Sequence, residues 1–449
     1  MARIRVPPSM ASLLDRVNSQ DFLPLLGKYV ATDRKGRYLH WNEFKWRVES
    51  GDREEVAWLA TKIARNSIRQ NLPLKAETER YFSFCVPNSL AALLHRIDRM
   101  TGGGDAIGDK TFTSPRENHR YLVQNLMMEE AITSSQLEGA STTRKVAKKM
   151  LESNLQPQNK SEQMIFNNFL LMKEVLKRKD EALSVDMLLD LHKIATYNAI
   201  ENQATPGALR QDNTIFISDL YNENPFYPPS VETLEDRLNE LCSFANASHD
   251  EQDSHNFIHP IVKAIILHFM IGYIHPFGDG NGRTARAIFY WCMLKSGYWL
   301  FEYVSISKWI QEKRNEYDTA FIYTETDEFD ITYFIYNQAE TIVKAVVDLH
   351  DYIDRRKKEF YEFMEWIESS PIAKTLKREH LEILKQAVKE PGREFTSKQV
   401  SLDLGVTENS ARSYLNKLVD RELLVSAKSK NGKTIRYLAP ASLKDRLKA

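Results

Sequence analysis

The amino-acid sequence predicts a mainly α-helical protein whose helical core carries a short β-hairpin and is followed by a distinct C-terminal module. Three observations predict this fold class. Apolar residues recur three and four positions apart over most of the chain, as they do on the buried face of a helix. A glycine-rich turn at residues 275–286 separates two strongly apolar segments. A helix–turn–helix pattern with a hairpin signal follows residue 372.

Length and composition are those of an ordinary globular protein. The chain has 449 residues, which predicts roughly two to four domains, and its formal net charge is zero. No overall field therefore favours nucleic acid or membrane as a partner. Three cysteines are too few and too widely spaced for a disulfide framework. Because no apolar run reaches a membrane span of roughly 18 residues, and the first residues form no apolar signal segment, we expect a cytoplasmic protein.

Residues 1–105 are predicted to form an N-terminal helical region. Segments 54–65 and 88–99 each place apolar side chains on one helical face. We interpret the Trp and His residues of this region as packing residues rather than as a ligand site. The regions predicted to follow are a core, a charged helical linker and a C-terminal domain, at residues 106–350, 351–371 and 372–449.

A helix predicted over about residues 117–139 ends in an acidic residue followed by a glycine. Glu138 is unfavourable at a helix C-terminus, where the helix dipole places partial negative charge, whereas Gly139 suits the C-cap. Ser134 lies four residues earlier on the same helical stripe. Glu138 is therefore either a solvated surface residue or the partner of a cation elsewhere in the chain.

A short β-like run follows a helix that Ser184 is predicted to cap over residues 185–196. The run comprises Ile215, Phe216 and Ile217, with turn-forming residues on both sides. From the residues alone it is an ordinary surface hairpin.

The turn at residues 275–286 brings together groups that suit phosphate chemistry. His275 is able to accept a proton near neutral pH, and Asp279 is the kind of hard oxygen ligand that Mg²⁺ uses beside phosphates. The glycines of the turn leave backbone N–H groups free to bind an anion at a helix N-terminus. Arg283 and Arg286 share one face of the helix that begins here. The pattern predicts phosphate binding with proton abstraction, although turns rich in Gly, Asn and Asp are also common between helices.

The segment from His275 to Arg286 resembles the signature of Fic-domain proteins, His-Pro-Phe-x-Asp/Glu-Gly-Asn-Gly/Lys-Arg-x-x-Arg, and matches it at each fixed position. Ser134 with Glu138 and Gly139 is similar to the family's inhibitory motif, Ser/Thr-x-x-x-Glu-Gly/Asn. Because this motif precedes the signature, the arrangement resembles class II of the family. The resemblance covers roughly residues 85–350.

This resemblance implies a Fic helical core and the activity of a protein adenylyltransferase (AMPylator). Such an enzyme transfers AMP from ATP to a Ser, Thr or Tyr hydroxyl of a target protein or of itself. The resemblance implies that His275 is the general base, that Asp279 holds Mg²⁺, and that Glu138 pairs with Arg286 and excludes the γ-phosphate. The implied nucleotide-binding residues are Gly280, Asn281, Gly282, Arg283 and Arg286. The implied flap, which holds the target by strand pairing, contains Ile215, Phe216 and Ile217.

Two positions depart from the family pattern near the nucleotide base. Fic proteins usually show Asn-Arg-x-x-Tyr-Tyr after the signature, and this chain has Lys313 and Asp318 in place of the first and last of these residues. The resemblance therefore does not define the contacts to the base or the base preference. His268, seven residues before His275, is interpreted as a hydrogen-bonded core histidine rather than a metal ligand.

The C-terminal domain differs from the rest of the chain in charge. Residues 371–449 contain 17 Lys and Arg against 9 Asp and Glu, a net charge of +8 that suggests an interaction module. Thr396 and Thr407 are predicted to cap two helices, and Asn431-Gly432 indicates a hairpin. This order resembles a winged helix, a module that binds DNA or protein and also supports homodimers. The candidate DNA-binding residues are Arg412, Lys417, Lys430 and Lys433.

Two other functions remain open from the sequence. A deAMPylase of the same fold would use Glu138 to position water for the hydrolysis of an AMP-modified side chain. A DNA-binding regulator would use the core only to sense nucleotide.

Overall fold

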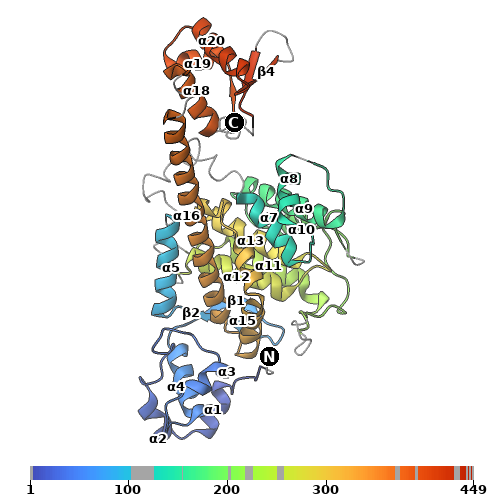
Figure 1. Cartoon of the computed structure of the whole chain (residues 1–449). Helices are drawn as coiled ribbons and strands as arrows, with labels where there is room; N and C mark the ends of the chain where they lie inside the picture. Colours follow the sequence, from blue (N-terminus) through green and yellow to red (C-terminus); the bar gives the residue numbers. More distant parts are fainter. Residues whose placement is uncertain are drawn as a thin grey trace. The chain divides into compact units, whose positions relative to one another are not determined.

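The computed structural model describes residues 4–102, 126–153, 155–200, 204–217, 226–249, 257–369, 375–389, 393–428, 435–440, 443 and 446. The described chain forms two compact units, one ending at Asp348 and one beginning at Leu349. Figure 1 shows that each unit is mainly helical and carries short strands. None of the described helices is both long enough and apolar enough to cross a lipid bilayer.

The N-terminal part of the first unit is a small helical cluster followed by a β-hairpin (Figure 1). Trp58 and Leu59 of α4 are buried against Trp41 and Phe44. The helices predicted at 54–65 and 88–99 are confirmed as α4 and α5. The elements in chain order are α1 (Met10–Arg16), α2 (Ser19–Phe22), η1 (Leu23–Leu25), α3 (Trp41–Phe44), η2 (Lys45–Arg47), α4 (Glu54–Asn66), β1 (Arg69–Lys75), β2 (Tyr81–Cys85) and α5 (Asn88–Thr101).

The region predicted as helical at residues 1–105 also contains a β-hairpin that was not predicted. β1 and β2 are antiparallel, with Arg69 opposite Cys85. Leu72 and Leu74 of β1 are buried while their neighbours are more exposed, which is the alternation expected of a strand. Pro73 obscured this pattern, because proline is unfavourable inside a sheet except at an edge or an irregularity, and the register shifts within this strand.

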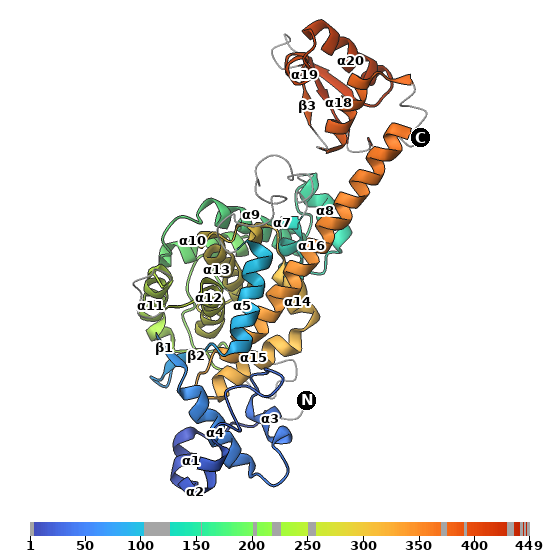
Figure 2. The ribbon, with the colours of Figure 1, turned by 90° about the vertical axis from the view of Figure 1, so that its left-hand side faces the viewer.

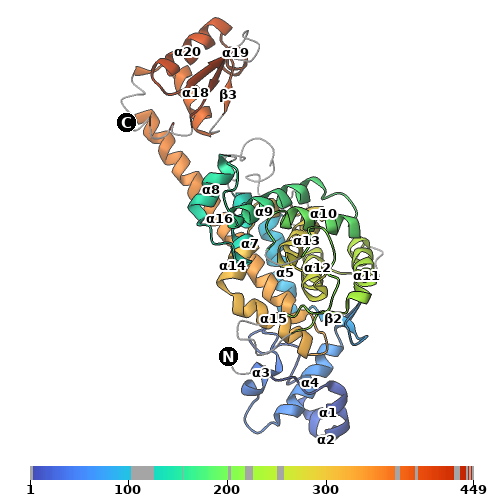
Figure 3. The ribbon, with the colours of Figure 1, turned by 90° about the vertical axis from the view of Figure 1, so that its right-hand side faces the viewer.

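The centre of the core is the pair α12 and α13, and Figures 2 and 3 show α9, α10 and α11 packed around it. In α12, which is the strongly apolar segment before the turn, 12 of 15 residues are buried. Ser184 caps α10 over the predicted range, with its side chain accepting from Met187 N. The elements of this part are α7 (Leu126–Leu137), α8 (Arg144–Glu152), α9 (Lys160–Lys177), α10 (Val185–Thr196), η3 (Val231–Thr233), α11 (Leu234–Asn246), α12 (Pro260–Ile274), α13 (Asn281–Lys295), η4 (Trp299–Glu302), α14 (Ile306–Glu312), α15 (Arg314–Thr326) and α16 (Thr332–Ser369).

The helix predicted to begin within the glycine-rich turn starts at Asn281 and carries Arg283 and Arg286. Gly280 is its N-cap and adopts a φ of 81°. α16 continues without a break to Ser369, so the described part of the segment predicted as a helical linker at 351–371 is helical. The charged residues of that segment have good helix propensity and extend the helix. The two compact units divide within α16, after Asp348.

The second unit packs three helices against a three-stranded antiparallel sheet of order β3-β5-β4. Thr396 and Thr407 cap α19 and α20 as predicted. β4 begins at Val425, before the predicted hairpin turn, and β3 was not predicted because two residues carry no periodic signal. Lys430, Lys433 and the predicted hairpin turn lie outside the described residues. The elements are α18 (Arg378–Lys389), β3 (Glu394–Phe395), α19 (Ser397–Leu404), α20 (Glu408–Asp420), β4 (Val425–Lys428) and β5 (Ile435–Leu438).

Candidate active site

The turn between α12 and α13 starts at His275, which ends α12 in the left-handed conformation with φ 48° and ψ 57°. A non-glycine residue is uncommon there, and the surrounding contacts hold it. The Arg210 guanidinium donates from Nε to the His275 carbonyl oxygen at 2.9 Å, and the Arg210 backbone N–H donates to the Pro276 carbonyl at 2.9 Å. The backbone of the turn is therefore fixed by a segment that lies 65 residues earlier in the chain.

The imidazole of His275 is oriented as a neutral base. Its Nδ1 lies 3.3 Å from the Gly272 carbonyl oxygen, and because a carbonyl only accepts, Nδ1 carries the proton of that contact. Nε2 keeps its lone pair available for a proton. Burial lowers the pKa of His275 to about 4, so the ring is uncharged at neutral pH.

Asn281 closes the turn upon itself. Its Oδ1 accepts from the Phe277 N–H at 3.0 Å, and its Nδ2 donates to the Phe277 carbonyl at 2.8 Å. The Asn281 side chain therefore shapes the turn instead of pointing to a ligand. The first N–H group with a partner inside α13 is that of Thr284, which donates to the Gly280 carbonyl at 3.0 Å. The N–H groups of the three preceding residues lie at the free helix N-terminus, which attracts an anion.

Arg283 lies beneath this helix N-terminus and is 1% exposed. Its Nη1 donates to the Ala195 carbonyl at 2.6 Å, and its Nη2 lies 3.5 Å from Asp279 Oδ1. Nε and Nη2 are buried and make no hydrogen bond to any described residue. Burial lowers the pKa of Arg283. A buried guanidinium with unused donors costs stability unless an anion satisfies it, so the geometry favours a bound phosphate.

Arg286 is held by α7. The structure brings it into contact with Ser134 and Glu138, as the predicted inhibitory contact requires. Its Nε donates to Ser134 Oγ at 2.8 Å, and its Nη2 donates to the Ser134 carbonyl at 3.1 Å and to Glu138 Oε1 at 2.8 Å. Burial disfavours the ionised carboxylate of Glu138, but the charges of Arg286 and Arg283 outweigh this and hold its pKa below the usual value. Gly139 follows with a φ of 97°, a conformation that suits glycine.

The carboxylate of Glu138 lies directly over the N-terminus of α13. A Cβ atom built on Gly282 would be 2.1 Å from Glu138 Oε1 and 3.1 Å from Arg286 Nη1. Gly282 is therefore the residue that allows this close approach. The Glu138 carboxylate occupies a position that suits a phosphate oxygen, because it meets both the helix N-terminus and Arg286 there.

Glu130 docks α7 onto the core one turn before Ser134, and it was not predicted as a functional residue. Its carboxylate is 2% exposed and accepts from Ser305 Oγ at 2.9 Å, Ser307 N at 3.1 Å and Ser307 Oγ at 2.6 Å. Burial raises the pKa of Glu130. These bonds hold α7 at the start of α14 and so fix the distance between Glu138 and Arg286.

His192 is a second positioning residue that the sequence did not reveal. Its Nε2 donates to the Asp279 carbonyl at 2.8 Å, while its Nδ1 accepts from the Gly207 N–H at 3.0 Å. The ring stacks on Phe277 with a centroid distance of 3.8 Å. Burial lowers the pKa of His192 to about 4, so the ring stays neutral in this role. The only sequence signal was its place on the apolar face of α10.

A pocket opens beside the turn, and one face of α15 forms a wall of it. Residues of the turn, the end of α7 and the predicted flap contribute the rest. The lining residues are Leu137, Glu138, Ile217, Phe226, Gly272, His275, Asn281, Gly282, Arg286, Arg314, Tyr317, Asp318, Phe321, Ile322 and Glu325. Buried His268 meets the Tyr317 hydroxyl at 3.2 Å, as expected of a core histidine.

The predicted flap is described only in part. Ile217 and Phe226 exchange two backbone hydrogen bonds of 2.8 Å, which make one antiparallel bridge. Ile215 and Phe216 belong to no strand, so the described residues of the flap form a single bridge instead of the predicted three-residue run. Phe216 is 55% exposed, whereas Ile217 lines the pocket.

Asp279 is suited to the Mg²⁺ role that the sequence suggested. Its Oδ1 accepts from the Gly280 N–H at 2.5 Å, and its side chain is 29% exposed. The described residues contain no group of three or more His, Cys, Asp or Glu side chains that would hold a metal ion by themselves. Mg²⁺ at phosphate sites uses one or two carboxylates together with the phosphates, so a single carboxylate beside the anion site fits that ion.

Comparisons with known proteins point to one family. Residues 182–293 match the model of the Fic/DOC family, a range that contains the turn and His192 but not Glu138. The chain is 27% identical over 199 residues to the protein adenylyltransferase Fic of Nematostella vectensis, covering 42% of this chain and 43% of that protein. It is 30% identical over 124 residues to the protein adenylyltransferase fic-1 of Caenorhabditis elegans, covering 28% of this chain and 22% of that protein. The chain thus spans less than half the length of these relatives.

Two solved structures of Fic proteins align with the chain at TM-scores below 0.5. A Fic family protein from Desulfovibrio desulfuricans G20 aligns with a TM-score of 0.47 and 17% identity, over 80% of this chain and 98% of that one. Fic-1 of Caenorhabditis elegans aligns with a TM-score of 0.46 and 19% identity, over 60% of this chain and 73% of that one.

Proposed function

We propose that this chain is a protein adenylyltransferase that transfers AMP from ATP to a hydroxyl group of a protein. One observation carries the proposal: a neutral histidine adjoins an anion site whose buried arginine, Arg283, has unused donors. The match to the Fic/DOC model and the names of the curated relatives support the same reaction class.

The reaction follows from the placement of these groups. The acceptor hydroxyl attacks the α-phosphorus of ATP, a new oxygen–phosphorus bond forms, and the bond to the β-phosphate oxygen breaks, releasing pyrophosphate. His275 Nε2 takes the hydroxyl proton. Arg283, Arg286 and the N–H groups that begin α13 offset the charge that builds up on the phosphates, and electrostatics of this kind dominate phosphoryl transfer. Mg²⁺ bound at Asp279 would neutralise further phosphate charge.

We propose that the chain is autoinhibited in the class II manner. Arg286 engaged by Glu138 is not free for the γ-phosphate, and the Glu138 carboxylate repels an anion at the same helix N-terminus. Both effects oppose a productive pose of ATP. The contact is rigid because Glu130 fixes α7 and Ser134 supplies two more bonds to Arg286.

The proposal is tested by the position of the label that reaches protein. The Glu138→Gly variant, incubated with Mg²⁺ and ATP labelled at either the α- or the γ-phosphate, should label protein only from the α-labelled nucleotide. Transfer from γ-labelled ATP would indicate a kinase and contradict the proposal. Release of AMP from a pre-labelled protein by the unmodified chain would instead favour the deAMPylase.

Glu325 makes nucleotide binding depend on pH. Burial raises the pKa of this pocket residue to about 8, so it is mostly a neutral acid at pH 7. Above pH 8 it becomes negative and repels the triphosphate, and we expect the affinity for ATP to fall by up to about tenfold per pH unit there. Calorimetric titration of ATP between pH 7 and 9 measures this. Glu325→Gln keeps the size of the side chain but cannot ionise, so it should remove the fall in ATP affinity above pH 8. An equal fall in that variant would show that Glu325 is not the group responsible.

We further propose that the second unit is a winged helix that binds nucleic acid. α20 buries Ala411, Leu415 and Leu418 and leaves Arg412 and Lys417 exposed on its outer side. This basic face suits the role of a recognition helix with phosphate contacts.

A further inference from the structure

A second cavity lies in the N-terminal cluster, in a region that none of the chemistry above uses. The segment from Gly27 to Arg37, the short helices at Phe44 and Arg47, and one side of α4 enclose it. Its volume is about 660 Å³, within the usual range for small-molecule sites. None of its lining residues lines the pocket beside His275.

The walls of this N-terminal cavity combine apolar surface with an excess of positive charge. Val30, Leu39 and Phe44 supply the apolar part. Six lining side chains are cationic and two are acidic. Most of the cations are paired, for example Arg37 with Asp33, but exposed Lys35 has no ion pair among the described residues.

Thr61, on α4, supplies the second observation. It is 1% exposed and lines the cavity, yet its hydroxyl has no hydrogen-bond partner among the described residues. A threonine inside a helix usually donates to the carbonyl four residues earlier. Six other helical threonines here do so, namely Thr101, Thr133, Thr196, Thr284, Thr324 and Thr326. A buried hydroxyl without a partner is costly, and a ligand oxygen in the cavity would satisfy it.

We propose that the N-terminal cavity is a binding site for a small molecule with an apolar body and one anionic group, such as a carboxylate or a phosphate. The apolar body packs on Leu39 and Phe44. An oxygen of the ligand accepts from the Thr61 hydroxyl, and Lys35 with the neighbouring cations attracts the anionic group. Arg65, 1% exposed, closes the base of the cavity and is held by the Ala31 and Leu39 carbonyls at 3.1 and 2.8 Å.

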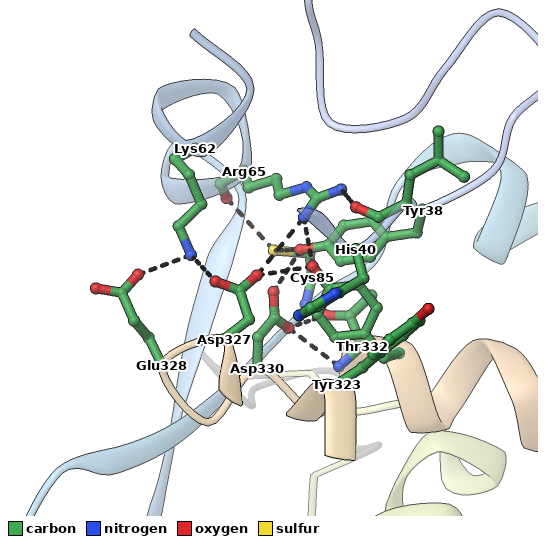
Figure 4. A network of polar contacts seen from close by, with 12 residues as sticks. Tyr38, His40, Lys62, Arg65, Cys85, Tyr323, Asp327, Glu328, Asp330 and Thr332 are labelled. Carbon is green, nitrogen blue, oxygen red and sulfur yellow. Dashed lines mark hydrogen bonds and ion pairs between the residues drawn. The ribbon is translucent and has the colours of Figure 1, made fainter. Parts of the chain in front are cut away.

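Arg65, at the base of the cavity, belongs to a polar network that includes Asp327 at the end of α15 (Figure 4). α15 also forms a wall of the nucleotide pocket. Arg65 Nη1 donates to the Tyr333 hydroxyl at 2.8 Å, and that hydroxyl donates to Asp327 Oδ2 at 2.7 Å. Lys62, fully buried, meets the other oxygen of Asp327 at 2.8 Å. Asp327 directly follows α15. A shift of α4 on ligand binding would therefore move the end of the helix that carries Glu325.

His40, next to the cavity residue Leu39, makes a second contact with α15. Its ring stacks on Tyr323 of α15 at a centroid distance of 4.0 Å (Figure 4). Its Nε2 also meets the Thr326 hydroxyl at 3.3 Å. Glu328 and Phe329, between α15 and α16, both adopt positive φ angles near 60°. Two successive non-glycine residues in this conformation persist only where their surroundings enforce it. A small change at the N-terminal cavity is thus passed on by a junction already held under strain.

Phenyl phosphate and benzoate test the site in the full-length chain, with benzyl alcohol as the uncharged control. By calorimetric titration we expect saturable binding of both anions with a Kd of about 1 mM or tighter, and none of the alcohol. Thr61→Val, which keeps the β-branched shape, and Lys35→Glu should each weaken binding about fivefold or more. Lys177→Glu, the same charge change on α9, should leave binding unchanged.

Several results would overturn the proposal. These are the absence of saturable binding, equal binding of benzyl alcohol, or anion binding that both Thr61→Val and Lys35→Glu leave intact. Thermal melting of the variants shows whether each retains the fold, and Lys35→Glu keeps the test valid because that side chain is exposed. For the link to α15, benzoate should change the affinity for ATP in the unmodified chain but not in Lys35→Glu. An equal change in both would show that benzoate acts at the nucleotide pocket itself.

Discussion

Replacing Glu138 with glycine should raise the rate of AMP transfer about tenfold or more. The substitution removes the carboxylate that pairs with Arg286 and lies over the N-terminus of α13. A charge-assisted hydrogen bond contributes roughly 1.5–3 kcal/mol, which corresponds to about a 10- to 150-fold change in an equilibrium. Incorporation of α-labelled AMP into the chain itself or into added protein measures the rate, and ATP titration should show a parallel gain in affinity.

Two matched variants separate charge from packing in this contact. Glu138→Gln keeps the shape and an acceptor for Arg286 but removes the negative charge. Its rate of AMP transfer should therefore lie between the rates of the unmodified chain and of Glu138→Gly. Ser134→Ala removes one bond to Arg286 and leaves Glu138 in place, so its effect should be smaller than that of Glu138→Gly. If the Glu138→Gly rate matched that of the unmodified chain, the autoinhibition would be refuted.

Local sequence signals predicted those parts of the molecule that depend on neighbouring residues. Ser184 before an apolar-periodic segment marked α10, and the uniformly apolar segment after His259 marked the central helix. The residues of the turn were found because their chemistry is concentrated in twelve consecutive positions. Such features need no knowledge of which distant segments meet.

Contacts between distant segments account for most of what the sequence did not show. Glu130 looks like any acidic helix residue until Ser305 and Ser307 approach it from 175 and 177 positions away. Arg210 and His192 support the turn in the same manner. The contact of Glu138 with Arg286 was inferred through a family resemblance, because the helix dipole indicated a nearby cation without identifying the residue. Long-range pairing leaves little trace in a single sequence.

The N-terminal cavity illustrates a different limit. Thr61 satisfies every expectation for a buried residue on the inner face of α4, and only the missing hydrogen bond distinguishes it. Such an absence is a property of three-dimensional packing, since the carbonyl that would usually accept lies in the same helix. Polar groups without partners are rare in protein interiors, which makes them useful markers for sites that composition does not reveal.

Replacing His275 with asparagine should lower AMP transfer by roughly 10²–10⁴-fold while preserving the fold, because a general base contributes about that much. Asparagine is the sharper choice than alanine, since it tolerates the left-handed conformation at this position and its amide can still donate to the Gly272 carbonyl. The measurement is best made in the Glu138→Gly background, where the rate is high enough for a large loss to be seen. An unchanged rate, with melting unchanged as well, would exclude His275 as the base.

The pH dependence of AMP transfer by the Glu138→Gly variant tests the role of His275 independently. A histidine with an ordinary pKa would lose activity as the pH falls through about 6.5. Burial lowers the pKa of His275 to about 4, so it stays neutral well below that, and we expect the rate to hold until the pH approaches 4 to 5. A fall centred near 6.5 would mean that His275 is more solvated in the working enzyme than in this structure. The low pKa of His275 makes it a weaker base than free imidazole. The arginines and the N-terminus of α13 must therefore supply most of the rate enhancement, by stabilising the negative charge that develops on the leaving pyrophosphate.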